Sequence, residues 1–197
     1  MNRIPTTLAA GAALAFAATA PAAVFDDFFD NSFLDDQVAG TSTVDGLTLA
    51  VANTVGGTFR SNSTGTGLQS AVAGTNDNAQ FETGETFTLT FDGAGTIDSI
   101  TGFQFPGTST VTFTNGTDVA TATLDEDDDN GQTLVVAAVG LAFDAGDLIT
   151  VETNATVVAG RPNGFRLQEI AVTETVVPEP ASLALLGLGG LALRRRR

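Results

Sequence analysis

The sequence contains no cysteine, histidine, lysine, tryptophan or tyrosine. Without cysteine, the chain can form neither a disulfide framework nor a thiolate metal site, and it has no cysteine nucleophile. Without histidine, it lacks the usual general base, the commonest zinc ligand and every Ser-His-Asp arrangement. Without lysine, it has no phosphate-binding loop of the GxxxxGK type. These absences exclude much of enzymology and favour a non-enzymatic protein.

Basic residues are scarce in the central part of the chain. Between residues 24 and 177 there are 22 acidic residues and only three basic ones, Arg60, Arg161 and Arg166, which gives this part a formal charge of −19. Such a surface repels nucleic acid and anionic lipid, and it attracts divalent cations. We therefore expect no nucleic-acid partner and a well-hydrated, acidic exterior.

The first 22 residues have the features of a secretory signal. Arg3 provides a positive start, residues 8–18 form a small-residue apolar core, and Ala20 and Ala22 flank a proline at the expected cleavage site. We expect signal peptidase to cut before Ala23. An uncleaved N-terminal helix is the alternative.

The last twenty residues contain three elements in a fixed order. The tripeptide Pro178, Glu179 and Pro180 comes first, and an apolar run over 181–193 follows it. Four arginines end the chain: Arg194, Arg195, Arg196 and Arg197. The apolar run can enter a bilayer, the arginines stop its passage on the cytoplasmic side, and the prolines hold the tripeptide extended.

This C-terminal segment resembles the PEP-CTERM sorting signal of exported bacterial proteins, which is also called an ice-binding protein C-terminal domain. The resemblance implies that exosortase, a membrane-embedded transpeptidase-like enzyme, recognises the tripeptide and removes the hydrophobic tail. Thirteen apolar residues reach about 20 Å as a helix, which is short of the roughly 30 Å hydrocarbon core. We therefore expect either a transient anchor or a locally thinned bilayer. An ordinary C-terminal membrane anchor and a soluble helix with a basic end are the alternatives.

The part between the two ends alternates with a period of two residues. Phe87, Leu89 and Phe91 share one face of an extended segment, and the threonines between them share the other. Turn dipeptides such as Asp92-Gly93 and Asn115-Gly116 separate this segment from other short candidates. We expect the further strands at 47–52, 57–60, 79–81, 97–105, 110–114, 119–124, 133–143, 148–153, 156–158 and 165–176.

These strands predict an all-β fold, a two-sheet antiparallel β-sandwich of the jelly-roll type over residues 23–177. A signal helix (1–22) and a hydrophobic sorting or anchor helix (178–197) are expected to flank it. The phenylalanine-rich and aspartate-rich stretch 24–30 is expected to be an edge strand, with a membrane-proximal arm as the alternative.

Two strands carry more specific predictions. Residues 133–143 are apolar on both faces, which predicts a central strand covered on both sides or a strand bent at Gly140. In the last strand, Phe165 and Leu167 have odd numbers whereas Ile170 and Val172 have even ones. A β-bulge near Gln168 and Glu169 would direct all four apolar side chains into the core.

The body also resembles jelly-roll and galactose-binding-like sandwiches that precede PEP-CTERM signals. The segment 82–85 leading into 87–91 carries this resemblance, together with the closing stretch 164–172. It implies carbohydrate binding and, in some members, a structural calcium ion.

The densest acidic run, 125–131, is the candidate for such an ion. Asp125, Asp127 and Asp129 are spaced two apart, as an oxygen-ligand calcium loop requires. The EF-hand pattern nevertheless fails, because Asn130 stands where glycine is needed and Val136 where the bidentate glutamate is needed. A solvated hairpin loop explains the same residues. Calcium is the one cofactor that we consider.

Three functions remain open for an exported protein of this kind. The first is a non-enzymatic cell-surface or extracellular-matrix protein with an acidic face. The second is a module that binds exopolysaccharide through loops at one end of the sandwich. The least favoured is a calcium-dependent glycosidase, which would need two carboxylates about 5 to 10 Å apart. Threonine strings at 86, 88, 90 and 110, 112, 114 resemble ice-facing ladders, but no fixed repeat period supports that reading.

Overall fold

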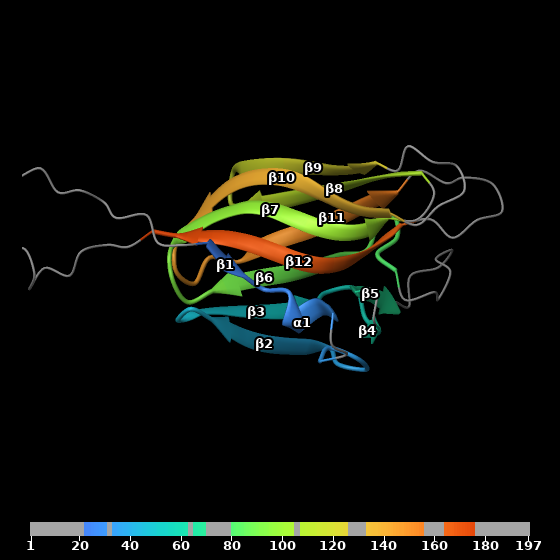
Figure 1. Ribbon diagram of the computed structural model, residues 1–197, viewed down its shortest axis with the longest axis horizontal. Coiled ribbons are helices and arrows are strands. Elements are labelled where there is room, and N and C mark those ends of the chain that lie inside the picture. The colour runs from blue at the N-terminus through green and yellow to red at the C-terminus, as the bar shows by residue number, and fades with distance from the viewer. Residues whose placement is uncertain are drawn as a thin grey trace, which may run out of the picture. The chain divides into compact units, whose positions relative to one another are not determined.

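A computed structural model describes residues 22–30, 33–62, 65–69, 80–104, 107–125, 133–155 and 164–175. These residues form two antiparallel β-sheets packed face to face, which confirms the predicted all-β sandwich (Figure 1). Within the described ranges no helix is both long and apolar enough to cross a membrane. The two predicted terminal helices lie outside the described residues, except that Ala22 begins the first strand.

The first sheet, sheet A, contains six strands. In spatial order these are β10 (Thr133–Phe143), β7 (Gly95–Gln104), β12 (Phe165–Glu174), β5 (Gly65–Gln69) and β4 (Thr58–Asn62), with β1 (Ala22–Val24) also paired to β12.

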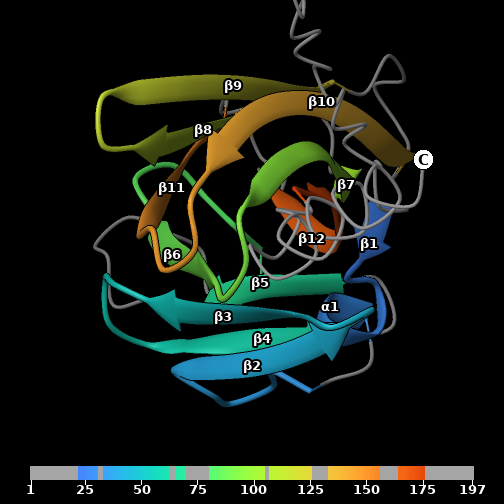
Figure 2. The ribbon, with the colours of Figure 1, turned by 90° about the vertical axis from the view of Figure 1, so that its left-hand side faces the viewer.

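The second sheet, sheet B, also contains six strands and runs from β2 at the bottom to β9 at the top in Figure 2. In spatial order these are β2 (Ala39–Val44), β3 (Leu47–Asn53), β6 (Thr86–Phe91), β11 (Ile149–Ala155), β8 (Thr108–Asn115) and β9 (Asp118–Asp125).

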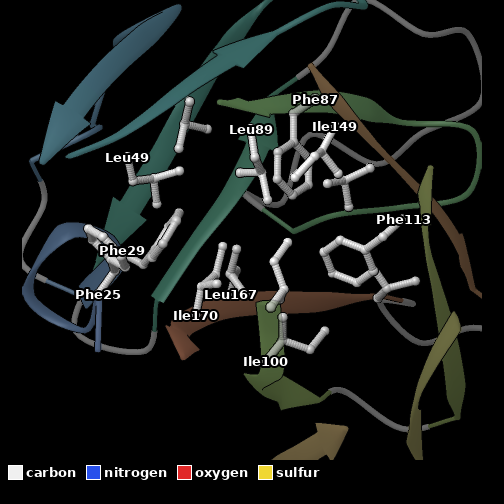
Figure 3. Packing of buried hydrophobic residues seen from close by; sticks show 14 of the residues in the cluster. Phe25, Phe29, Leu49, Phe87, Leu89, Ile100, Phe113, Ile149, Leu167 and Ile170 are labelled. Carbon is white, nitrogen blue, oxygen red and sulfur yellow. The ribbon is translucent and has the colours of Figure 1, made fainter. Parts of the chain in front are cut away.

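The core lies between the inner faces of the two sheets (Figure 3). Strand β6 shows how the sequence builds it: Phe87, Leu89 and Phe91 are each at most 1% exposed. Ile149 and Val151 of the neighbouring strand β11 pair with Leu89 and Phe87 and are also fully buried. The two-residue alternation therefore decides which side chains enter the core.

The sequence has no tryptophan or tyrosine, so phenylalanine supplies the aromatic rings of the core. Phe81 stacks on Phe87 of sheet B at a ring-centroid distance of 4.7 Å, and it lies 5.4 Å from Phe165 of sheet A. Phe59 meets Phe81 and Phe87 edge-on at 6.5 and 6.4 Å. Such ring pairs contribute stability beyond their buried area, so this aromatic cluster ties the two sheets together.

The predicted bulge in the closing strand is confirmed. The pairing of β12 with β7 shifts register between Leu167 and Glu169. Phe165, Leu167, Ile170 and Val172 are all at most 2% exposed, on either side of the shift. The extra residue changes the parity of the strand, which is how both apolar pairs reach the same face.

Strand β10 is not the central strand that its apolar sequence predicted. It lies at the end of sheet A and pairs only with β7 among the described strands. Leu134 is 53% exposed and Val136 is 66% exposed, so one apolar face of the strand points to solvent. The alternative, a bend at Gly140, is confirmed: the register shifts between Ala138 and Leu141, and Gly140 has a φ of +74° that glycine adopts without strain.

The stretch 24–30 is a strand only at its beginning, so the predicted edge strand is wrong beyond Val24. Helix α1 (Asp27–Asp30) is a single helical turn. Phe25, Phe28 and Phe29 are all buried. Phe25 precedes the helix, and its N–H donates to the carbonyl of Ile170 at 3.0 Å, whereas Phe28 and Phe29 lie in the helical turn. Phe28 and Phe29 thus cover the core from a helical turn and not from a strand.

Sequence patterning missed two of the strands. β2 and β5 contain mainly glycine, alanine, threonine and serine, and they lack the large alternating apolar residues that the other strands carry. The expected strand at 79–81 is reduced to isolated bridges, from Gln80 to Leu68 and from Phe81 to Phe165. The expected strand at 156–158 lies outside the described residues.

We expect Phe87→Ala to lower the free energy of unfolding by about 3 to 5 kcal/mol, because it removes a buried ring from the aromatic cluster. Urea denaturation of the mature protein measures this change. Thr121→Ala, at an exposed position of β9, should shift stability by no more than about 0.5 kcal/mol. Equal losses in both variants would contradict the proposed role of the cluster.

Candidate functional site

The two ends of the described body lie next to each other. Strand β1 pairs with the end of β12, with Ala22 opposite Thr173 and Val24 opposite Ala171. Beyond β12, the N–H of Thr175 donates a hydrogen bond to the carbonyl of Ala94 at 2.8 Å. The start of β1 and the end of β12 therefore meet at one end of the sandwich, on the left in Figure 1. The predicted signal segment and the C-terminal segment therefore both connect to the body at this end.

The same end carries six carboxylates, which we call the acidic pole. Its members lie in the turns and strand ends that the antiparallel pairing brings to this end: Asp45, Asp92, Asp118, Asp144, Asp147 and Glu174. The pairing of Gly95 with both Phe143 and Glu174 places three of these chain segments side by side. The two arginines of the described residues, Arg60 and Arg166, lie in β4 and at the start of β12, away from this pole.

Hydrogen bonds hold two of these carboxylates in place. Asp92 accepts a bond from the N–H of Thr48 at 2.6 Å, and this backbone bond is the largest cause that lowers the pKa of Asp92. Asp147 accepts bonds from the N–H of Asp144 and from the side-chain amide of Asn115, each at 2.8 Å, and these lower the pKa of Asp147. Because these donors favour the ionised form, Asp92 and Asp147 keep their negative charge to a lower pH than an ordinary aspartate does.

The sequence-predicted site residues fall mostly outside the described residues. The tripeptide Pro178, Glu179 and Pro180, and the arginines from Arg194 to Arg197, belong to that part of the chain. Asp127 and Asp129 do too. Asp125 is described: it ends β9, is exposed, and accepts a hydrogen bond from the hydroxyl of Thr108 at 2.7 Å. Within the described ranges, no group of three or more acidic side chains is arranged to hold a metal ion.

The segment 82–85, which suggested the jelly-roll resemblance, forms a turn in which Glu82 and Glu85 are buried and the two residues between them are exposed. The carboxylate of Glu85 is 1% exposed and accepts the N–H of Glu82 at 2.8 Å. The hydroxyl of Thr153 donates to the carbonyls of Glu82 and Glu85, and Thr83 exchanges hydrogen bonds with Ala155. This network fixes the start of β6 against β11. The turn therefore has a structural role, in which the carboxylate of Glu85 accepts a backbone hydrogen bond.

The outer face of sheet B brings the two threonine strings together. Strand β11 lies between β6 and β8, so that Thr88, Thr150 and Thr114 form one row across three strands. Glu152 interrupts the adjacent row between Thr86 and Thr112. The threonines thus line a hydroxyl-rich face across strands, an arrangement that the search for a repeat along the sequence could not find.

A hollow of about 410 Å³ opens in this face over β2, β3 and β6. Its lining includes Ala50 and Ala52 of β3 and Thr88 and Thr90 of β6, with Leu148 at one side. No charged residue lines it. From the sequence we expected a ligand site in the loops at one end of the sandwich. The small residues of β2 and β3 were the sequence signal for this hollow, and the prediction did not use them.

We expect the stability of the protein to fall below about pH 4 partly through Asp92 and Asp147. Their pKa values in the folded state lie below the unfolded value of about 3.9, so their contribution is present above that pH and is lost as the pH falls through the folded values. In urea titrations at pH 7 and pH 3, Asp92→Asn and Asp147→Asn should each reduce the difference in stability between the two pH values. Asp118→Asn removes the same charge from the same pole without these hydrogen bonds, and an equal effect there would contradict the assignment.

Comparison with known proteins identifies the C-terminal segment. Residues 176–197 match the PEP-CTERM protein-sorting motif, which begins two residues before the tripeptide. No curated protein and no solved structure matches the chain. The predicted resemblance is therefore confirmed for the tail. This motif, attached directly behind the last strand of a β-sandwich, marks the chain as an exported, envelope-targeted protein that is sorted by exosortase.

Proposed function

We propose that the protein is a non-enzymatic component of the cell surface or extracellular matrix, delivered as a folded sandwich on its sorting segment. One observation carries the proposal: the sorting motif begins at residue 176, directly after Thr175, whose N–H is hydrogen-bonded to the carbonyl of Ala94 in the sandwich. The processing signal thus follows the closing strand of the sandwich directly along the chain. Signal peptidase and exosortase are the two processing partners.

The charge of the body supports a display role at the exterior. The acidic pole lies at the end of the sandwich where β12 ends, and carboxylates there repel anionic head groups over a distance of about 8 to 10 Å at physiological salt. Three residues, 175–177, separate the end of β12 from Pro178 and span at most about 11 Å. Attachment to the membrane before processing would therefore depend on the tail and not on the body.

The chemistry of the described surface supports a non-enzymatic role. The chain has no histidine or cysteine, and no carboxylate lines the hollow on sheet B. A glycosidase would need two carboxylic acids facing one cleft. The hollow instead presents methyl and hydroxyl groups, which can bind a ligand but offer no group for acid-base work.

Carbohydrate binding is the second candidate function, and the same hollow favours it. A volume of about 410 Å³ lies within the roughly 300 to 1,000 Å³ range of small-molecule sites, and its lining combines apolar and hydroxyl groups. Exopolysaccharide is the partner that an exported protein would meet. A calcium-supported version of this function would rest on Asp125, Asp127 and Asp129.

Mass spectrometry of the mature protein from the native envelope tests the proposal. We expect an N-terminus at Ala23 and a C-terminus near the Pro178 to Pro180 tripeptide, because both hydrophobic ends should be removed. The same fractions should show no release of sugar from polysaccharide. A protein found in the cytosol with both ends intact would refute the proposal.

Replacing Pro178 and Pro180 together by alanine should leave the unprocessed precursor in the membrane fraction, because the rigid tripeptide that exosortase is expected to recognise is lost. Immunoblots of membrane and surface fractions measure the change in size and location. Pro162→Ala provides the matched control for a proline in the body. Normal processing of the double variant would show that the tripeptide is not required.

A further inference from the structure

The hollow on sheet B results from a strip of alanines. Most outward positions on this sheet carry threonine, but β2 and β3 place Ala39, Ala50 and Ala52 there, with Ala39 paired to Ala52. Because alanine is smaller than threonine, the space that threonine side chains fill elsewhere on this face stays empty here. The hollow therefore follows from the choice of residue at three positions on paired strands, and its floor consists of methyl groups.

The sides of the hollow carry hydroxyl groups. Thr90 and Thr88 of β6 pair with Ala50 and Ala52, and Thr41 of β2 pairs with Ala50 from the other side. The hydroxyl of Thr88 donates to the carbonyl of Ala52 at 3.3 Å, which fixes this side chain. Among the described residues, the hydroxyls of Thr41 and Thr90 have no hydrogen-bond partner, so they can donate to or accept from a ligand.

Further hydroxyls lie beyond both ends of the hollow along β3. At one end the hydroxyls of Thr43 and Thr48 lie 3.1 Å apart, and at the other those of Thr54 and Thr86 lie 2.6 Å apart. Leu148, which is 63% exposed, adds an apolar edge. A ligand that follows β3 would meet methyl groups beneath it and hydroxyl groups along its length.

This combination fits a sugar ring, which has apolar C–H faces and hydroxyl edges. The uncharged lining and the net charge of −15 disfavour an anionic ligand, and a cation would gain more from the acidic pole. An extended peptide that added as a strand would pair with the outer edge of β2, which ends the sheet among the described strands, and would lie beside the hollow and not in it, because β3 beneath the hollow is paired on both sides. Of the ligand classes considered, a neutral molecule with many hydroxyl groups fits the hollow best.

We propose that the hollow formed by Ala39, Ala50 and Ala52 on sheet B binds an internal stretch of a neutral polysaccharide. This inference rests on the carbohydrate-binding candidate function and moves its site from the loops to the face of the sheet. The hollow lies on an open sheet surface, which allows a long chain to continue past it in both directions. The chain has no tryptophan or tyrosine for stacking, so hydroxyl and methyl contacts carry the binding.

Affinity electrophoresis of the mature protein in native gels tests the proposal. The gels contain a neutral β-glucan, galactomannan or dextran, with alginate as the anionic comparison. We expect at least one neutral polysaccharide to retard the protein and alginate not to do so. Ala50→Leu and Ala52→Leu should each weaken binding at least fivefold by filling the hollow, and Thr90→Val should weaken it about threefold to tenfold by removing a hydroxyl at nearly constant volume.

Ala138→Leu is the matched control, since Ala138 is an exposed alanine on β10 of the other sheet. It should leave binding unchanged, and circular dichroism should show that all variants are folded. Binding that persists in both Ala50→Leu and Ala52→Leu would place the carbohydrate site elsewhere and overturn the proposal while leaving carbohydrate binding intact. Retardation by none of the neutral polysaccharides, or preferential retardation by alginate, would also overturn it. None of these results would bear on the proposed surface location, which is tested separately by mass spectrometry of the termini of the mature protein.

Discussion

The structure depends on the pairing of the closing strand, β12. This strand lies between β7 and β5 in the middle of sheet A, and its far end also holds β1. The register shift after Leu167 allows one strand to bury four large side chains that would otherwise divide between two faces. Since one extra residue reverses the direction of every following side chain, this local feature decides which side chains of β12 enter the core.

The pairing of β1 with β12 has a topological consequence. Residues close to each predicted processing site are held in neighbouring strands, so the N-terminal and C-terminal segments attach at one end. The buried apolar residues of the described chain extend from Ala23 to Val172, which lie within the predicted mature body. A body of this kind can fold around its own core whichever end is processed first.

The polar surface is divided by chemistry. Six carboxylates lie in the turns and strand ends of the acidic pole, and two of them, Asp92 and Asp147, accept backbone hydrogen bonds. Hydroxyl and methyl groups occupy the outer face of sheet B, where the outward positions of regular strands repeat every second residue. The acidic composition of the chain therefore does not make every surface acidic, and the one hollow described on sheet B has a neutral lining.

The sequence by itself determined the features that depend on local order along the chain. The alternation of Phe87, Leu89 and Phe91 predicted a half-buried strand, the parity change before Ile170 predicted the bulge, and the order of tripeptide, apolar run and arginines predicted the sorting motif. Each depends on neighbours a few residues apart, so no tertiary information is needed.

Only the tertiary structure decided which strands become neighbours. The apolar strand β10 lies at an edge, whereas β2 and β5, which have few large apolar residues, still pair within the sheets. Strand order is set by contacts between distant segments, which local sequence does not show. The acidic pole and the alanine-floored hollow arise in the same way, from residues that are separated in sequence and adjacent only after the sheets have formed.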